Sequence, residues 1–206
     1  ERDALIRDFE RNEAVPVAGR IEQKLDSMES NMDSIARFFR SGEMVTRDEF
    51  LEFTGHILEK NKDIRALDWV PHVLDSQRDE YEKKASDELN WEYCFRERSL
   101  EGKMVRTGRR DEYFPVYYFE PRAGNQASAG FDNYSESVRK ETLDKSRSSG
   151  EKMLAVNLNL VQDKNKKPGF LFFQPVYYNG KPTGTSEERF ANIRGFVVAV
   201  FHMDDT

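Results

Sequence analysis

The sequence predicts an α+β domain in which a long N-terminal stalk helix precedes an antiparallel sheet flanked by helices. Apolar residues recur at alternating steps of three and four through the first forty residues, which is the period of an α-helix. Segments rich in aromatic and branched residues, which favour strands, concentrate later in the chain. Because helices come early and strands cluster late, the pattern favours an α+β fold over a strictly alternating α/β fold.

The N-terminal helix carries one continuous apolar stripe. The stripe consists of Val17, Ile21, Leu25, Met28, Met32, Ile35 and Phe39. Its spacing resembles heptad positions, which suits either a coiled-coil seam or a helix lying on a domain. Three further apolar residues begin it before Pro16, where we expect the helix to kink or restart. We therefore expect a stalk helix over residues 1–45 and a separate sensing unit over residues 46–206.

Capping signals indicate three later helices. Thr46 and Glu49 form a Ser/Thr-x-x-Glu capping box, so a second helix is expected directly after it. Ser76 and Ser135 can cap a third and a fourth helix by accepting hydrogen bonds from free backbone amides. Gly150 is in position to end the fourth helix in a left-handed conformation.

Six segments are strand candidates because each is rich in aromatic or branched residues. They are Ile64 to Val70, Glu92 to Arg96, Tyr113 to Phe119, Met153 to Val161, Phe170 to Tyr178 and Gly195 to His202. The fourth segment alternates apolar residues with asparagines, and a polar turn over residues 163–169 leads into the fifth, which predicts a hairpin. This one-sided amphipathicity predicts an antiparallel sheet with helices on one face.

Composition argues against a nucleic-acid-binding protein. The chain has 206 residues, a net charge of -6 and 34% charged residues of both signs, mixed along its length. A nucleic-acid-binding surface is basic and clustered, so none is predicted. The nearest candidate is Arg106 with Arg109 and Arg110, but Asp111 and Glu112 follow at once, which favours a solvated loop over an anion site.

The chain offers few signals of compartment. The single cysteine, Cys94, cannot form an internal disulfide, and its apolar neighbours suggest a thiol packed in a strand. No stretch approaches the roughly 18 consecutive apolar residues of a membrane span, and no signal peptide opens the chain. The abrupt start at Glu1 and the stop just past a strand-like run at Thr206 suggest a fragment of a longer protein.

Catalytic and metal-binding signatures are not found in the sequence. His56, His72 and His202 are the only histidines, and none has a second ligand-type residue at metal spacing. There is no GxSxG elbow, no Walker loop and no GxGxxG after a strand. We therefore predict no catalytic residues, no metal and no cofactor, and an enzyme is disfavoured.

Aromatic strands suggest a binding pocket instead. Residues 113–119 and 170–178 contain more Phe and Tyr than a minimal core needs, and such strands can wall a mostly apolar pocket. Asp132 lies between bulky residues at the approach to the fourth helix. It is either a polar contact for a ligand or a turn or cap residue, and the sequence leaves both readings open.

Six strings resemble the CHASE family, the extracytoplasmic sensory domains of receptor histidine kinases and diguanylate cyclases that include the plant cytokinin receptors. Residues 64–71 resemble the family's "aLeWvPrV", residues 78–85 its "eRaafEa.A" and residues 113–117 its "YfPVy". The others are GFD at 130–132, PVY at 175–177, and GFVVAVF at 195–201 followed by Asp204. In order and spacing these strings cover nearly the whole chain.

The resemblance implies a PAS-like antiparallel sheet after the stalk helix. It also implies a periplasmic or extracellular location, membrane spans outside this chain that anchor it, and a homodimer formed through the stalk. A small-molecule ligand would order the sheet and shift the two stalk helices relative to each other, since differential affinity for two states drives such a change. The alternative is a non-binding module that only holds dimer geometry or contacts another protein, with the aromatic strands as solid core.

The resemblance also implies the site residues. Asp132 matches an aspartate that accepts hydrogen bonds from the adenine ring in cytokinin-binding members, and Leu154 matches an apolar wall residue. With Tyr118, Phe131, Tyr134 and Phe173 they make up the expected ligand site. One departure concerns residues 172–177, FFQPVY, where the plant receptors resemble LTFPVY. Phe173 thus replaces a threonine, so a different small ligand is as well supported as an adenine-like cytokinin.

Overall fold

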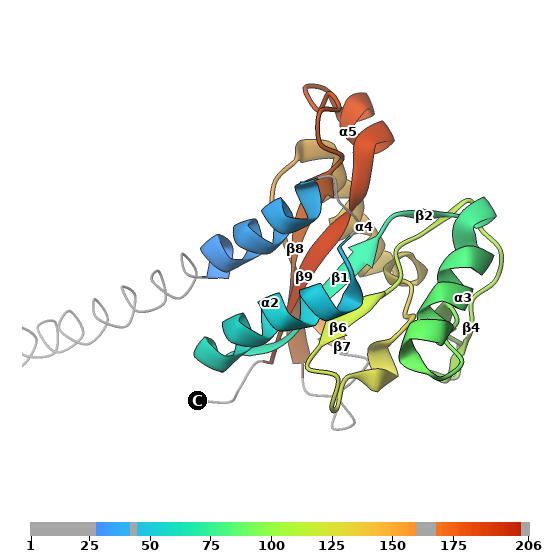
Figure 1. The fold of residues 1–206 in the computed structure, drawn as a ribbon. Helices are drawn as coiled ribbons and strands as arrows, with labels where there is room; N and C mark the ends of the chain where they lie inside the picture. The colour runs from blue at the N-terminus through green and yellow to red at the C-terminus, as the bar shows by residue number, and fades with distance from the viewer. Residues whose placement is uncertain (1–27, 42–44, 160–167, 203–206) are drawn as a thin grey trace, which may run out of the picture.

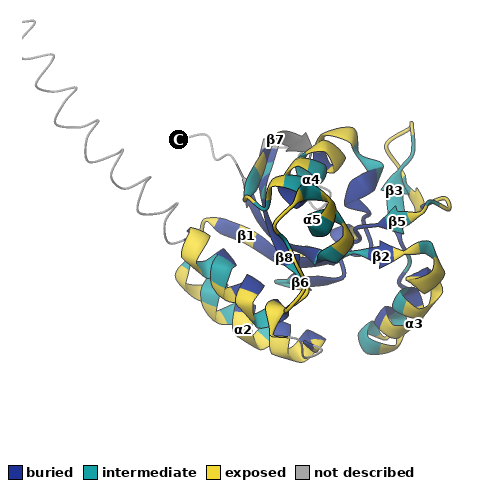
Figure 2. Ribbon diagram, turned by 90° about the horizontal axis from the view of Figure 1, so that it is seen from above, coloured by how far each residue is buried: buried dark blue, intermediate teal, exposed yellow. Residues whose placement is uncertain are grey.

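The computed structural model describes residues 28–41, 45–159 and 168–202. A central twisted sheet separates two groups of helices, and a smaller lobe with one helix and short strands lies beside one edge of the sheet (Figure 1). The view from above shows helices on both faces of the sheet and buried residues concentrated between the layers (Figure 2). The expected α+β class and the antiparallel sheet are confirmed.

The sheet has five antiparallel strands in the order β6-β1-β9-β8-β7. Their bounds are β1 Ile64–Pro71, β6 Tyr118–Glu120, β7 Met153–Asn159, β8 Pro168–Tyr177 and β9 Ile193–His202. The expected hairpin is present as the pairing of β7 with β8, although its turn lies outside the described residues. The central strand β9 is buried at every position from residue 195 to residue 201.

Consecutive residues of β1 show the two faces of this sheet. Successive side chains of a strand point to opposite faces, so Asp68 and Trp69 lie on different sides. Asp68 pairs with Val198, and Trp69 with Val197 and Tyr118. We call the side of Asp68 the inner face and the side of Trp69 the outer face.

The outer face is covered by a helix over residues 28–40 and by α2 (Arg47–Lys60). In the first helix Met32 and Ile35 are 0% exposed and Phe39 is 2% exposed. The Phe39 ring stacks on Trp69 with 3.8 Å between ring centroids. The described part of the apolar stripe therefore packs into the core of its own sheet, and the part before residue 28 lies outside the described residues.

The inner face is covered by α4 (Ser137–Ser149), which contacts β7 and β8, and α5 (Ser186–Asn192) packs on α4. Helices on a single face were expected, and that expectation is wrong. The reason is visible in β9, where residues 196–201 are all apolar, because a strand buried on both faces loses the alternation of a half-buried one.

The edge lobe contains α3 (Arg78–Leu89) and two small two-stranded sheets. One sheet pairs β2 (Val73–Leu74) with β5 (Glu112–Tyr113), and the other pairs β3 (Arg96–Arg98) with β4 (Met104–Arg106). The strand expected over Glu92 to Arg96 is wrong except at its last residue, so Cys94 precedes β3 rather than lying in a strand. The strand expected over Tyr113 to Phe119 divides into β5 and β6, with an irregular segment between them.

The capping predictions gave mixed results. The Thr46 and Glu49 capping box is confirmed, as is the left-handed end of α4 at Gly150, whose φ is 82°. Ser76 instead lies in a 3-10 turn, and α3 begins without a side-chain cap. Ser135 donates its hydroxyl to the Asp132 carbonyl rather than capping α4. The capping box that starts α5 was missed.

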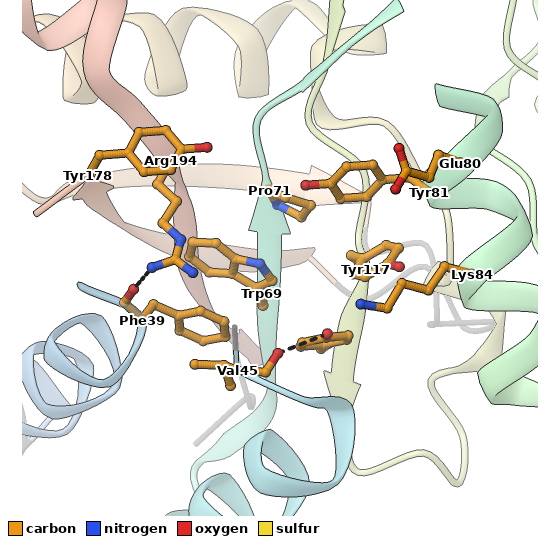
Figure 3. Close-up of a pocket in the computed structure, with 11 residues that line it drawn as sticks. Phe39, Val45, Trp69, Pro71, Glu80, Tyr81, Lys84, Tyr117, Tyr178 and Arg194 are labelled. Atoms are coloured by element: carbon orange, nitrogen blue, oxygen red, sulfur yellow. Dashed lines mark hydrogen bonds between the residues drawn. The ribbon is translucent and has the colours of Figure 1, made fainter. Parts of the chain in front are cut away.

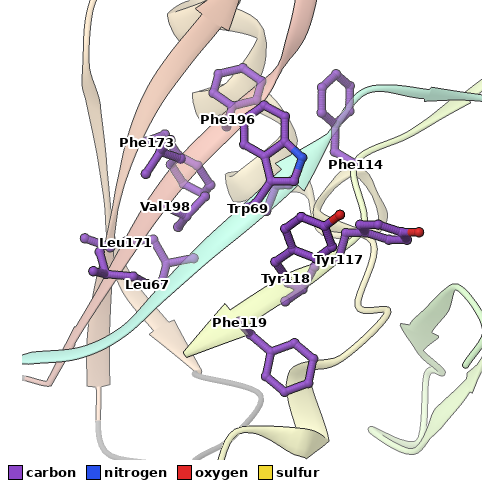
Figure 4. Packing of buried hydrophobic residues seen from close by; sticks show 14 of the residues in the cluster. Leu67, Trp69, Phe114, Tyr117, Tyr118, Phe119, Leu171, Phe173, Phe196 and Val198 are labelled. Carbon is purple, nitrogen blue, oxygen red and sulfur yellow. The ribbon is translucent and has the colours of Figure 1, made fainter. Parts of the chain in front are cut away.

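Aromatic side chains fill the core around β1. Figure 4 shows Trp69 with rings from residues 114–119 on one side and Phe173 and Phe196 from β8 and β9 on the other. At Gly195 the chains approach so closely that a Cβ atom would lie 2.5 Å from the Val70 carbonyl oxygen and 2.9 Å from the Trp69 indole. The position therefore requires glycine, whose φ here is 155°.

Candidate ligand-binding sites

The six residues expected to bind a ligand divide between the two faces. Phe173 pairs with Val198 and so lies on the inner face, where Phe131 also lines a cavity with Asp68. Asp132 and Tyr134 follow Phe131 in the same loop. Tyr118 pairs with Trp69, and Leu154 pairs with Phe172, which places both on the outer face. The structure therefore does not bring the six residues together around one cavity.

Asp132 is fully buried, and groups of the chain itself occupy its carboxylate. One carboxylate oxygen accepts hydrogen bonds from the backbone N–H groups of Phe114 at 2.8 Å and Tyr134 at 3.1 Å. The other forms an ion pair with Arg110 at 3.1 Å. Burial raises the pKa of Asp132, while these donors oppose the rise. The geometry is that of a cap that joins the loop to the segment after β5.

Three of the other expected site residues contact groups of the chain itself, and a fourth lies on the surface. Phe173 is 0% exposed and meets Phe196 edge to face with 6.3 Å between centroids. The Tyr118 hydroxyl donates to the Val45 carbonyl at 3.1 Å, and the Tyr134 hydroxyl is hydrogen-bonded to Asp144. Leu154 is 49% exposed and is thus a surface residue of β7 rather than an enclosed wall.

A small cavity lies on the inner face, between the sheet and the layer formed by α4 and the 128–134 loop. Its lining residues are Asp68, Val70, Val116, Ser128, Phe131, Asn133, Arg139, Leu171, Val198 and Val200. Its volume is about 10 Å³. That is room for roughly one water molecule.

Asp68 is the unusual member of this lining. It is 4% exposed, and its Oδ1 atom has no hydrogen-bond partner among the described residues. Burial raises the pKa of Asp68 to about 7, and the nearby charge of Arg139 opposes the rise. Arg139 is itself buried, donates to Asn133 Oδ1 at 3.2 Å and is bonded to Glu136. Carboxyl groups with such shifted pKa values concentrate at functional sites.

A larger cleft of about 280 Å³ lies on the outer face, where Phe39 and Val45 meet β1, β6 and α3 (Figure 3). It is lined by Phe39, Val45, Trp69, Pro71, Glu80, Tyr81, Lys84, Tyr117, Tyr118, Tyr178 and Arg194. Of the expected site residues, only Tyr118 belongs to it. Its members come from both ends of the sequence, so no local pattern could have assembled them.

The cleft has a buried aromatic floor and a charged rim. Phe39, Trp69 and Tyr118 are each at most 5% exposed, whereas Tyr178 is 50% exposed. Arg194 bonds to the Phe39 carbonyl and lies over the Tyr178 ring with its guanidinium 5.9 Å from the centroid. The N-terminal helix is therefore tied to β9 at the edge of the cleft.

The arginines near residue 108 do not form an anion site in this structure. Arg106 pairs with Glu82, Arg109 with Asp75 at 3.0 Å, and Arg110 with Glu97 and Asp132. Within the described ranges, no group of three His, Cys, Asp or Glu side chains is placed to hold a metal ion. In the same ranges, no helix has both the length and the apolar character needed to cross a bilayer.

A protein family and a curated protein are similar to this chain. The family model of the CHASE domain matches residues 43–206. Hybrid signal transduction histidine kinase A of Dictyostelium discoideum is 25% identical over 162 residues. That alignment covers 76% of this chain but 8% of the relative, so the chain corresponds to a small part of that protein.

Proposed function

The chain belongs to the CHASE domain family, the sensory domains of signalling receptors, and we propose that it is the extracytoplasmic ligand sensor of a membrane-anchored receptor. Membrane spans outside this chain would anchor it, on the periplasmic or extracellular side. The D. discoideum relative is named as a histidine kinase, which supports a histidine kinase output, with a diguanylate cyclase as the other candidate. The domain itself has no catalytic role in this proposal.

The observation that carries a ligand-binding role is the unpartnered oxygen of Asp68 in the inner-face cavity. A buried polar atom without a partner costs about 1 to 3 kcal/mol. Apolar residues of similar volume often replace buried charged pairs without loss of stability, so a purely structural module gains little from Asp68 and Arg139. A ligand that donates a hydrogen bond to Asp68 removes this cost. An N–H group of an adenine-like ring or an ammonium group has the required chemistry.

Ligand entry requires the cavity to widen, since it now holds about one water. Asp68 belongs to β1, whereas Arg139 belongs to α4, so a molecule between them moves α4 and its loop relative to the sheet. Such a ligand favours the widened state by its differential affinity for the two states. Coupling of about 1 to 3 kcal/mol is typical and biases the two states five- to hundredfold.

The path from this cavity to the N-terminal helix is short. Trp69 follows Asp68 on β1, points to the other face and stacks on Phe39. A shift of β1 therefore acts directly on the helix over residues 28–40. In the proposed homodimer the seam is formed by stripe residues that precede residue 28, Leu25 among them, because the described part of the stripe already packs on its own sheet.

The test is calorimetry and thermal-shift measurement on the 206-residue chain with purines, including adenine and cytokinin-type adenines, and with small amines. At pH 8, above its pKa of about 7, Asp68 is mostly ionised, and hydrogen bonds to a charged group are the strong ones. We expect a ligand whose affinity falls about ten- to a hundredfold in Asp68→Asn. Asp87→Asn, a matched change on the exposed face of α3, should leave the affinity unchanged. A panel in which no compound binds contradicts the proposal.

A second candidate function is the non-binding module. It is favoured by the tight aromatic packing of the inner face, where Phe173 and Phe196 are both 0% exposed. A domain that binds none of the panel and still self-associates through its N-terminal helix supports this second function. A ligand whose affinity depends on Asp68 excludes it.

A further inference from the structure

We propose that the outer-face cleft is a second small-molecule site, separate from the inner-face cavity, that binds a small aromatic compound bearing a carboxylate. Its volume of about 280 Å³ is just below the roughly 300 to 1,000 Å³ of ordinary ligand pockets, so the occupant is small. The cleft and the inner-face cavity have no lining residue in common, because they lie on opposite sides of β1.

The aromatic lining of the cleft favours a ligand with an aromatic ring. Six of the eleven lining residues are aromatic. Trp69 on β1 belongs to the floor, whereas Tyr81 on α3 and Tyr178 after β8 lie on either side of it (Figure 3). Offset or edge-to-face ring pairs contribute beyond simple burial of area. A flat ring between these walls can meet more than one of them at once.

The charged residues around the cleft favour a carboxylate on the ligand. Lys84 and Arg194 stand at the rim on opposite sides of the cleft, and Glu80 is the lining carboxylate (Figure 3). Beside the lining, the Arg47 guanidinium lies 4.6 Å from the centroid of Tyr118. Glu88 lies 3.1 Å from Arg47 and 4.0 Å from Lys84, so three cations, Arg47, Lys84 and Arg194, stand against the two carboxylates Glu80 and Glu88. An aromatic cage can also attract a cation, but rim cations oppose it.

Tyr117 supplies an independent requirement for a hydrogen-bond acceptor. This side chain lines the cleft, is 4% exposed, and its hydroxyl is buried with no hydrogen-bond partner among the described residues. Burial raises the pKa of Tyr117, so the hydroxyl keeps its proton and remains a donor. Figure 3 draws that oxygen on the side of Lys84. A carboxylate beside Lys84 can therefore accept from both groups after a small movement of the lysine.

A matched series of three probes tests the ligand class: phenylacetate, phenylacetamide and phenethylamine, which carry the same ring with an anionic, a neutral and a cationic group. The chain has two tryptophans, so Trp91→Phe leaves Trp69 in the cleft as the single fluorescent reporter. The series is run with Asp68→Asn added to Trp91→Phe, so that the inner face offers the amine no carboxylate. We expect saturable quenching by phenylacetate, at least threefold weaker binding of the amide, and no binding of the amine. Binding of the amine equal to or tighter than that of phenylacetate overturns the assignment, as does a series in which nothing binds.

Two variants locate the probe. Lys84→Gln should weaken phenylacetate about two- to fivefold, as expected for a half-exposed charge, whereas Lys83→Gln, its exposed neighbour on α3, should have no effect. Tyr178→Ala removes an exposed wall and should weaken binding about two- to tenfold. Unchanged affinity in both Lys84→Gln and Tyr178→Ala overturns the location.

Asp68→Asn separates this site from the one on the inner face. Phenylacetate affinity should change less than twofold in this variant, because the cleft does not include Asp68. Loss of phenylacetate binding in a folded Asp68→Asn protein overturns the claim of two sites. Binding of the purines and amines is expected to depend on Asp68, whereas binding of phenylacetate is not. If no compound binds at one site, the other site can therefore still be tested.

Discussion

The two hollows on either side of β1 differ in how their polar groups are arranged. On the inner face, the charged groups of Asp68 and Arg139 are sealed in a cavity of about 10 Å³. On the outer face, charged groups stand at the rim of an open cleft of about 280 Å³, and aromatic rings form its floor. The inner face thus carries an energetic cost that a ligand or a proton can relieve, whereas affinity at the outer face must come from new contacts. Binding at the inner face should therefore depend strongly on small changes in the polar groups of the ligand, whereas the outer cleft should accept ligands that differ in such details.

The largest expected effect tests whether the outer face is really closed by the N-terminal helix. Met32→Ala should lower the free energy of unfolding by about 2 to 5 kcal/mol, since Met32 is 0% exposed in the core. Urea unfolding followed by circular dichroism measures this loss. Arg37→Ala, on the exposed side of the same helix, should stay within about 0.5 kcal/mol of the unmodified chain. A Met32→Ala protein of unchanged stability would show that the helix does not pack on the sheet.

The burial of Met32 changes how the stalk dimer should be tested. Glutamate at both Leu25 and Met32 would weaken any dimer, but the charge at position 32 would also disrupt the folded domain. Leu25→Glu alone is the cleaner variant, and analytical ultracentrifugation of the complete receptor ectodomain is the measurement.

The next effect is the pH dependence of stability that Asp68 contributes, which further distinguishes the inner face from the outer face. Asp68 has a pKa of about 7 in the folded chain against an ordinary value of 3.8, so the folded state holds this proton more tightly than the unfolded state. Its contribution to stability is therefore present below about pH 4 and is lost as the pH rises to about 7, by an amount on the order of 4 kcal/mol. Beyond that range it changes no further.

The measurement is the free energy of unfolding between pH 4 and pH 8 for the unmodified chain and for Asp68→Asn. The difference between the two curves should slope across this range and flatten at its upper end. Asp87→Asn, which lies on the surface, should give a difference curve without this slope. A flat difference curve for Asp68→Asn means that Asp68 is ionised throughout and is better solvated than its position indicates.

The smallest of these effects concerns Asp132. Asp132→Ala should cost about 1.5 to 3 kcal/mol of stability, because the buried N–H of Phe114 and the Arg110 guanidinium lose a charged partner. Affinity for an inner-face ligand should change little, since both carboxylate oxygens already serve the fold. Melting temperature and affinity are measured on one preparation. A large loss of affinity at unchanged stability would instead make Asp132 a ligand contact.

The sequence allowed most of the sheet to be predicted but neither hollow. β1, β8 and β9 were found within about two residues of their bounds because branched and aromatic residues run continuously through them. The same composition wrongly predicted one strand over Tyr113 to Phe119. There an irregular segment between β5 and β6 places its aromatic rings in the core. Asp68 stood inside a recognised string, but its burial depends on which face it takes and what covers that face. The outer cleft joins residues 39 and 194, which only the fold brings together.

Position 195 offers a way to find this cleft in other chains. The Trp69 indole reaches so near Gly195 that any side chain there would displace it, and with it the floor of the cleft. The two positions are therefore one joint requirement, although 126 residues separate them along the chain, counted from 69 to 195. A genome survey for the outer site should seek tryptophan on the first strand together with glycine at the start of the last strand. Chains with a larger residue at the second position should differ in the floor of the cleft and in the pairing of the two strands, because a Cβ atom there also meets the backbone of Val70 and Pro71.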